Sequence, residues 1–123
     1  MTTTVETTPA LALDERLLGA TLGALDLAAI YIGDHLGFYA ILADDAGRTV
    51  AELATSAGTD QRYTQEWLEQ QAVTGILRTD DDALAWDERR FALPPEHAGV
   101  LADPSSPDHL APFARMIVGI AGT

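Results

Sequence analysis

The side chains best suited to chemistry in this sequence are three histidines and a run of acids. His35, His97 and His109 each follow an acidic residue. A metal site needs several ligands that converge with a defined geometry, and neighbours in sequence point to different sides of a helix. The acidic run Asp80–Asp82 lacks the central glycine and distal glutamate of a calcium loop. The spacing therefore predicts no metal site, and a solvated hairpin loop at the acidic run.

Nucleophilic and cofactor chemistry are not predicted either. A serine nucleophile needs an adjacent histidine and carboxylate, whereas Ser56, Ser105 and Ser106 fall at expected helix ends or in a connector, where turn chemistry explains them. A nucleotide-type cofactor site needs a glycine-rich turn from strand to helix, and the ten glycines contain no Gly-x-Gly. The chain has no cysteine, which excludes thiolate sites and disulfides. We expect no catalytic and no cofactor-binding residue in this chain.

Composition favours one acidic domain. The chain has 123 residues and a formal net charge of −12, which is a usual size for a single domain. All seven basic residues are arginines. Contacts from basic side chains to phosphates supply most non-specific affinity for DNA, and an acidic surface opposes them. The composition therefore disfavours a nucleic-acid partner.

The elements that would position any site begin with a long apolar helix. The stretch from Leu11 to Leu42 predicts one long helix or two collinear helices, with apolar residues on nearly all sides. A helix of this kind is buried on more than one side, so a partner must cover part of it. An alternating four-three spacing marks the seam of a helix packed at a small angle on another. The predicted dimer interface is formed by Leu18, Leu22, Leu25, Ala29 and Ile32.

A membrane span is not expected at this helix. A spanning helix needs about 20 apolar residues with few charges, whereas the apolar run from Leu17 to Gly33 is shorter and contains Asp26. A signal peptide would begin with basic residues, and the first ten residues contain none. We expect a cytoplasmic protein with no membrane contact.

The rest of the chain predicts a winged helix-turn-helix. Thr49 and Glu52 have the spacing of a capping box, and that helix ends at Gly58. Thr59 or Asp60 would begin the next helix, which is expected to bury Tyr63, Trp67 and Leu68 and to end at Gly75. The segments 76–79 and 89–93 would pair as a wing, followed by a short helix and the start of another. The fold class is mainly α, with a long N-terminal helix and a two-stranded wing.

This shape is best known for reading DNA, but both parts that would approach phosphates are acidic. The segment Asp60–Thr74 carries one arginine against three acids, a formal charge of −2, and Asp80–Arg90 carries −3. Gln61, Arg62 and Gln65 are placed to touch bases, yet they lack a basic surround. A DNA-binding regulator remains the alternative function at this point.

Two motifs identify a resemblance. R-Y-x-x-E-W-L at Arg62–Leu68 and L-P-P-E-H-A at Leu93–Ala98 lie in a stretch, Leu25 to Met116, that closely resembles the N-terminal part of bacterial class I S-adenosylmethionine-dependent methyltransferases. The resemblance implies a winged-helix domain that forms a homodimer and caps a catalytic domain. S-adenosylmethionine is implied for the full-length family only, because the residues that bind it there have no matching positions here.

The resemblance also divides the chain. Residues 1–10 are expected to be a disordered tail, 11–112 a winged-helix dimerisation domain, and 113–123 the start of a linker helix toward a catalytic domain absent from this chain. Phe113, Met116 and Ile117 would then form part of a substrate-cavity wall. A stand-alone protein that binds a small molecule in that cavity is a further alternative.

Overall fold

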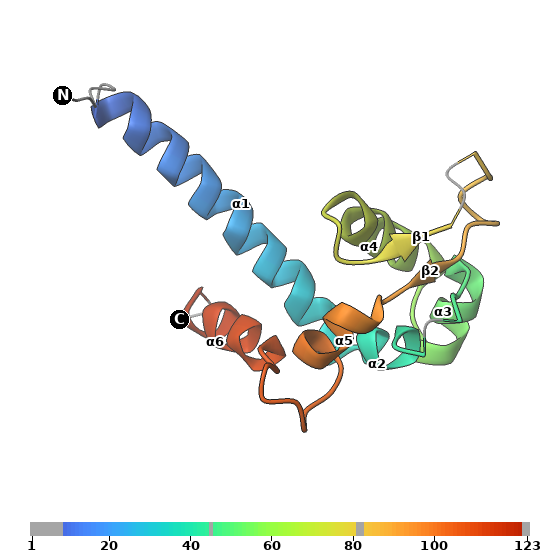
Figure 1. The fold of residues 1–123 in the computed structure, drawn as a ribbon. Helices are drawn as coiled ribbons and strands as arrows, with labels where there is room; N and C mark the ends of the chain where they lie inside the picture. The colour runs from blue at the N-terminus through green and yellow to red at the C-terminus, as the bar shows by residue number, and fades with distance from the viewer. Residues whose placement is uncertain (1–8, 45, 81–82, 122–123) are drawn as a thin grey trace.

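The computed structural model describes residues 9–44, 46–80 and 83–121. The described chain is mainly helical, with one antiparallel two-stranded sheet (Figure 1). The elements are α1 (Pro9–His35), α2 (Phe38–Leu42), α3 (Val50–Ala57), α4 (Gln61–Val73), β1 (Arg78–Thr79), β2 (Phe91–Ala92), α5 (Pro95–Leu101) and α6 (Ala111–Ala121). The expected fold class, a winged helix-turn-helix with a long N-terminal helix and a two-stranded wing, is confirmed.

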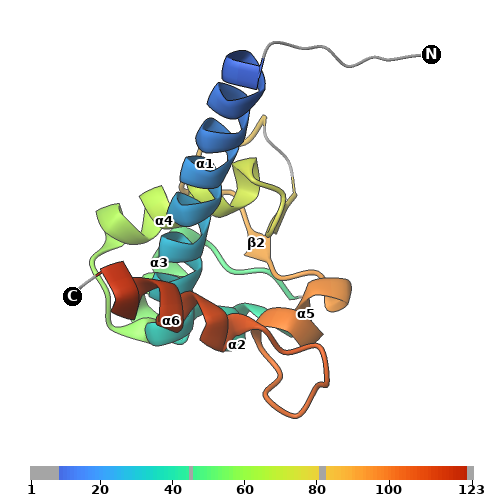
Figure 2. The ribbon, with the colours of Figure 1, turned by 90° about the vertical axis from the view of Figure 1, so that its left-hand side faces the viewer.

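The long helix differs from its prediction at both ends. It begins at Pro9, inside the expected tail, while residues 1–8 lie outside the described part of the chain. It ends at His35, and Gly37 takes a left-handed conformation with φ 77°, which glycine adopts without steric cost. α2 then leaves in a different direction (Figures 1 and 2). The segment is therefore two helices that are not collinear.

The core lies between α2, α3, α4 and the wing. Its largest fully buried side chains come from α2, α3, α4 and the segment around β2, and they are Phe38, Tyr39, Leu42, Leu53, Leu68, Phe91 and Leu93. Burying an apolar side chain of this size stabilises a fold by roughly 1.5–3 kcal/mol. The core thus supports the body of the domain, and α1 joins it through its C-terminal half.

Local capping signals place the two helices of the helix-turn-helix. The Thr49 hydroxyl accepts a hydrogen bond from the Glu52 N–H at 3.2 Å, and the Glu52 carboxylate accepts one from the Thr49 N–H at 3.0 Å. Asp60, rather than Thr59, caps α4 by accepting from the Tyr63 N–H at 3.1 Å. Gly58, with φ 69°, ends α3. The capping box and the stop were both predicted from sequence and are confirmed.

The wing contains one pairing that the sequence did not reveal. β1 and β2 pair with Arg78 opposite Ala92 and Thr79 opposite Phe91. Arg48, in the segment before α3, also bridges to Phe91: each backbone N–H donates to the carbonyl of the other, at 2.9 and 2.8 Å. The segment before α3 therefore pairs with β2 through this single bridge, in addition to the pairing between β1 and β2. In the acidic loop between the strands, Asp81 and Asp82 lie outside the described residues.

One core residue was predicted wrongly. Tyr63 is 71% exposed, whereas Trp67 and Leu68 are buried as expected. Thr64 and Gln71 are buried instead, at 1% and 0% exposure. The side of α4 that contacts α1 and α3 therefore does not include Tyr63. It includes the polar side chains of Thr64 and Gln71, whose hydrogen bonds are made inside the domain.

The last helix packs on the first. α6 lies beside the C-terminal half of α1 (Figures 1 and 2), and Arg115 of α6 forms an ion pair with Asp34 of α1 at 3.4 Å. α6 begins at Ala111, close to the expected boundary at 113. The N-terminal half of α1 extends away from the rest of the described chain (Figure 1).

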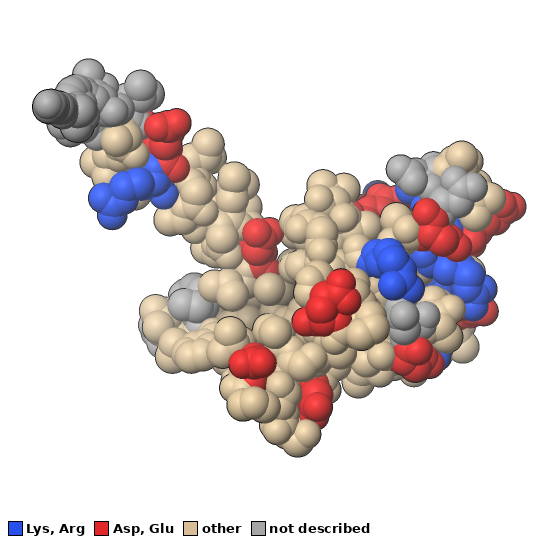
Figure 3. All heavy atoms as spheres, in the orientation of Figure 1, with Lys and Arg blue, Asp and Glu red and all other residues tan. Residues whose placement is uncertain are grey.

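By length and composition alone, Ala12–His35 is long and apolar enough to cross a membrane. This stretch is longer than the run from Leu17 to Gly33, which we expected to be too short for a membrane span. Buried core helices and signal sequences meet the same criterion, and 6% of this window is buried in the structure. Figure 3 shows few charged side chains on the projecting part of α1 between its tip and its base.

Candidate functional site

The residues predicted as a dimer interface lie along α1, and most of them face solvent. Leu18, Leu22, Leu25 and Ile32 are 61%, 54%, 61% and 44% exposed. Ala29 is partly buried against the core. We call these five residues the α1 row. An exposed leucine is common, but a continuous apolar row on a surface marks an interaction site.

The α1 row ends in a groove between α1 and α4. This α1–α4 groove has a cavity volume of about 450 Å³. Its lining residues come from α1, α2, α4 and the segments beside them, and they are Ala29, Ile32, Leu36, Phe38, Thr59, Tyr63, Thr64, Glu66, Trp67 and Gln70. Ala29 and Ile32 belong to both the row and the groove, so the two form one continuous apolar surface.

Trp67 fixes the spacing of α1 and α4 at this groove. Its indole N–H donates to the carbonyl of Ala29 at 2.8 Å, and its ring packs on Phe38 with centroids 4.6 Å apart. A methyl group placed on Gly33 would come within 2.3 Å of the indole. The close approach of the two helices therefore depends on glycine at this position.

A chain of side-chain hydrogen bonds runs from the core to α1. The Tyr39 hydroxyl donates to the Gln71 carbonyl oxygen, the Gln71 amide donates to Gln70 at 2.7 Å, and the Gln70 amide donates to the Asp26 carboxylate at 3.2 Å. Burial, and secondarily the charge of Asp34, raises the pKa of Tyr39, so its hydroxyl stays protonated and able to donate. Sequence reasoning missed this chain, because its partners lie on three separate helices.

The three histidines do not form a site together. His35 stacks on Tyr31 at 5.6 Å, and Nδ1 of His97 donates to the carbonyl of Ile76 at 2.8 Å. Nδ1 of His109 is buried without a hydrogen-bond partner in the described part of the chain. Among the described residues, no group of three or more His, Asp or Glu side chains is placed to hold a metal ion.

The residues predicted to line a substrate cavity lie apart from the α1–α4 groove. Phe113 and Met116 on α6 are 54% and 53% exposed, next to the exposed Ile120. The side chain of Ile117 lies outside the described residues. A substrate-cavity wall on α6 stays a prediction.

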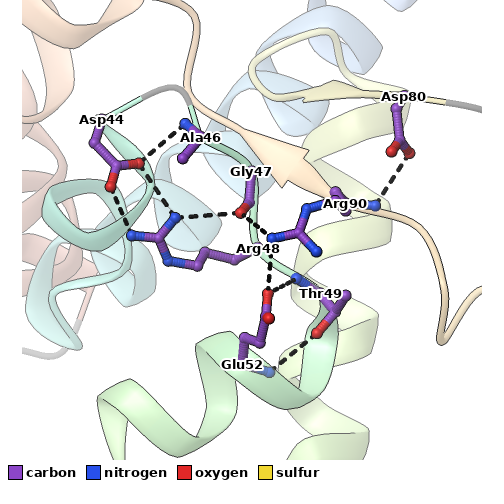
Figure 4. A network of polar contacts seen from close by, with 8 residues as sticks. All are labelled: Asp44, Ala46, Gly47, Arg48, Thr49, Glu52, Asp80 and Arg90. Atoms are coloured by element: carbon purple, nitrogen blue, oxygen red, sulfur yellow. Dashed lines mark hydrogen bonds and ion pairs between the residues drawn. The ribbon is translucent and has the colours of Figure 1, made fainter.

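Two arginines near α3 are engaged within the domain (Figure 4). Arg48 pairs with Asp44 at 2.6 Å, and Arg90 pairs with Glu52 at 3.3 Å. Both guanidinium groups also donate to the carbonyl of Gly47, at 3.2 and 3.0 Å. The hydrogen bond from Arg48 lowers the pKa of Asp44. The Thr49 backbone N–H, and then the charge of Arg90, lower the pKa of Glu52. The network joins the wing to α3.

A family model describes residues 23–103 as an Rv2258c-like winged helix-turn-helix domain. The chain belongs to this family. The matched residues include the second half of α1, the helix-turn-helix, the wing and α5. No curated protein matches the sequence.

Solved structures similar to this Rv2258c-like domain include the N-terminal regions of several methyltransferases. The mitomycin 7-O-methyltransferase MmcR is 31% identical with a TM-score of 0.62, over 89% of this chain and 30% of MmcR. CalO1, a methyltransferase in calicheamicin biosynthesis solved with SAH, is 31% identical with a TM-score of 0.53, over 85% of this chain and 28% of CalO1. PigF with SAH shares the fold at 20% identity and a TM-score of 0.66, over 85% of this chain and 28% of PigF. The Rv2258c-like domain thus spans less than a third of these neighbours.

Proposed function

We propose that this domain associates two subunits of a cytoplasmic S-adenosylmethionine-dependent methyltransferase and caps the substrate cavity of its catalytic domain, without transferring methyl groups itself. The similarity to N-terminal regions of MmcR and CalO1 supports the methyltransferase context. The exposed apolar face of α6 at Phe113 and Met116 supports a catalytic domain as a further partner. A small-molecule substrate would then lie between the two domains.

The observation that carries the association is the α1 row. Leu18, Leu22 and Leu25 are each more than half exposed on one helix of an isolated domain. Full burial of a leucine contributes roughly 1.5–3 kcal/mol, so a few leucines from each copy offset association costs of several kcal/mol. Two-fold dimers are the commonest closed assemblies of soluble proteins. A homodimer through α1 is therefore the favoured assembly.

Light scattering after size-exclusion chromatography tests this association. We expect a dimer for the wild type and a monomer or aggregate for Leu25→Asp, because a carboxylate buried without a partner is strongly disfavoured. Val73→Asp is the matched control, since Val73 is 87% exposed on α4 and lies outside the α1 row. A wild-type chain that is monomeric at high concentration would refute the proposed association.

The absence of catalysis by the domain alone has its own test. The sequence has no Gly-x-Gly turn that could hold a nucleotide-type cofactor. We expect calorimetric titration of the isolated chain with S-adenosylmethionine to show no saturable heat of binding. A saturable complex at micromolar concentration would contradict a purely associating and capping role.

A further inference from the structure

We propose that the pocket between α1 and α5 binds a small phenol, a neutral apolar ring with one hydroxyl group, and that His97 accepts the hydrogen bond from that hydroxyl. We call it the α1–α5 pocket. None of its lining residues belongs to the α1 row, the α1–α4 groove or the expected cavity wall on α6. The inference therefore goes beyond the proposed function, and it stands whether the chain is a monomer or a dimer.

The lining of the α1–α5 pocket is apolar apart from one imidazole. The pocket has a volume of about 240 Å³, and its described lining residues are Ile30 of α1, Ile76 between α4 and β1, and His97, Val100 and Leu101 of α5. An apolar cavity of about 150 Å³ is enough to hold benzene, so a single six-membered ring fits here. Ligand sites typically combine such apolar walls with a few well-placed polar groups.

The hydrogen bond made by His97 determines which ring nitrogen can serve a ligand. Nδ1 lies 2.8 Å from the carbonyl oxygen of Ile76, and a carbonyl oxygen can only accept, so Nδ1 carries the proton. In a neutral imidazole the other nitrogen is then an acceptor. No hydrogen bond of Nε2 is found within the described part of the chain. The pocket therefore offers a ligand one acceptor and no free donor.

The backbone holds both partners of this hydrogen bond in place. The Ile76 N–H donates to the Gln71 carbonyl at 3.0 Å, directly after the turn at Gly75, where φ is 82°. The His97 N–H donates to the Pro94 carbonyl at 2.9 Å in the first turn of α5. The ring is thus oriented before any ligand arrives, which lowers the cost of ordering it on binding.

These features select the class of ligand. An ammonium or a carboxylate would lose its hydration among four aliphatic side chains, with no opposite charge in the described lining, which is strongly disfavoured. A carbonyl or ether oxygen would find no donor, and a plain hydrocarbon would leave Nε2 without a partner once it shields that atom from water. A neutral ring with a hydroxyl meets both demands. A phenol hydroxyl is more acidic than an aliphatic one, and it is therefore the stronger donor.

Phenol and fluorobenzene test the inference, because the two molecules have the same shape and differ in the hydroxyl. The full chain is titrated with each at pH 8, where imidazole side chains are neutral, and its methyl resonances are followed by carbon–proton NMR. We expect saturable shifts at Ile30, Ile76, Val100 and Leu101, and phenol to bind at least threefold more tightly than fluorobenzene. Fluorobenzene is the more apolar of the two, so a preference for phenol requires a hydrogen bond.

Two substitutions separate the hydrogen bond from the shape of the pocket. His97→Asn keeps an N–H at the Nδ1 position for the Ile76 carbonyl but has no polar atom at the Nε2 position, so phenol should bind no more tightly than fluorobenzene. Val100→Phe fills the pocket and should abolish the binding of both. Val73→Phe is its matched control, because Val73 is 87% exposed on α4, and it should change neither affinity. Thermal unfolding checks the fold of each variant, and His97→Asn keeps the test valid if Val100→Phe does not fold.

Equal affinity of the wild type for phenol and fluorobenzene would overturn the inference, and so would a His97→Asn variant that still prefers phenol. Shifts centred on Ile32 and Leu36 would place the ligand in the α1–α4 groove and overturn it too. The absence of saturable shifts up to the solubility limit of phenol would show that the α1–α5 pocket holds only solvent.

Discussion

At the scale of single residues, Gly33 is the glycine with the least space for a side chain. A Cβ there would lie 2.3 Å from Trp67 and 2.7 Å from Tyr39. Both rings are buried in the core and cannot withdraw to solvent. The residue therefore sets how closely α1 and α4 approach, and it does so by the absence of a side chain.

We predict that Gly33→Ala lowers the free energy of unfolding by about 1–3 kcal/mol, the usual cost of overpacking. Gly119→Ala is the control, because its added methyl group would meet no atom within 4 Å and alanine favours a helix by up to about 1 kcal/mol over glycine. Urea unfolding of both variants measures the difference. Equal stability of Gly33→Ala and wild type would mean that α4 shifts freely against α1.

Acid should weaken the domain through the carboxylates of Figure 4. Asp44 and Glu52 have lowered pKa values in the folded state, caused first by the Arg48 hydrogen bond and by the Thr49 backbone N–H respectively. The unfolded chain binds protons more readily, so their stabilisation is present above the unfolded pKa near 4 and is lost as pH falls through the folded values.

We therefore predict that the urea concentration at the midpoint of unfolding decreases as the pH is lowered from 6 to 3. Asp44→Asn should be less stable than the wild type at pH 6, and the difference should narrow toward pH 3. Asp14→Asn, in the projecting part of α1, serves as the control for a general charge effect. A constant difference between wild type and Asp44→Asn across this range would contradict the role of the Arg48 contact.

At the scale of elements, what could be predicted from the sequence depends on the separation of the interacting groups. Thr49 and Glu52 are three residues apart, and their capping box follows from local spacing. The bridge between Arg48 and Phe91 joins distant segments with no matching side-chain pattern, because it is made by backbone groups. Tyr63 was misplaced for a related reason. Aromatic character alone does not reveal which side of α4 faces the core.

The capping box gives an element-scale prediction. Thr49→Ala should lower the free energy of unfolding by about 1 kcal/mol, the usual cost of losing an N-cap side chain. Thr55→Ala, on the exposed side of the same helix, should be neutral or slightly stabilising. Thermal unfolding followed by circular dichroism compares the two. If Thr55→Ala costs as much as Thr49→Ala, the cap does not determine where α3 begins.

For the whole molecule, the charge distribution argues against the best-known use of this fold. A winged helix-turn-helix does not by itself imply DNA binding. The segment that would enter a groove, Asp60–Thr74, has a formal charge of −2, and its Arg62 lies 3.9 Å from Glu66. In this protein the fold is combined with an acidic surface and with the apolar stretch of α1 from Leu17 to Gly33.

We predict no measurable affinity for duplex DNA at physiological salt. A mobility-shift assay at several salt concentrations tests this, because binding through phosphates weakens steeply as salt rises. Tight, salt-sensitive binding would support the DNA-binding regulator instead. Gln61→Arg and Gln65→Arg together would show whether added positive charge on α4 is enough to create such binding.

The position of Trp67 also gives the domain an intrinsic optical probe. The chain has two tryptophans. Trp86, 40% exposed in the wing loop, can be replaced by phenylalanine, which leaves the 7% exposed indole on the wall of the α1–α4 groove as the sole long-wavelength fluorophore. Its emission and its accessibility to an acrylamide quencher would then respond to whatever enters the groove. Dilution of such a variant through its association range would follow dimer dissociation by light, without any attached dye.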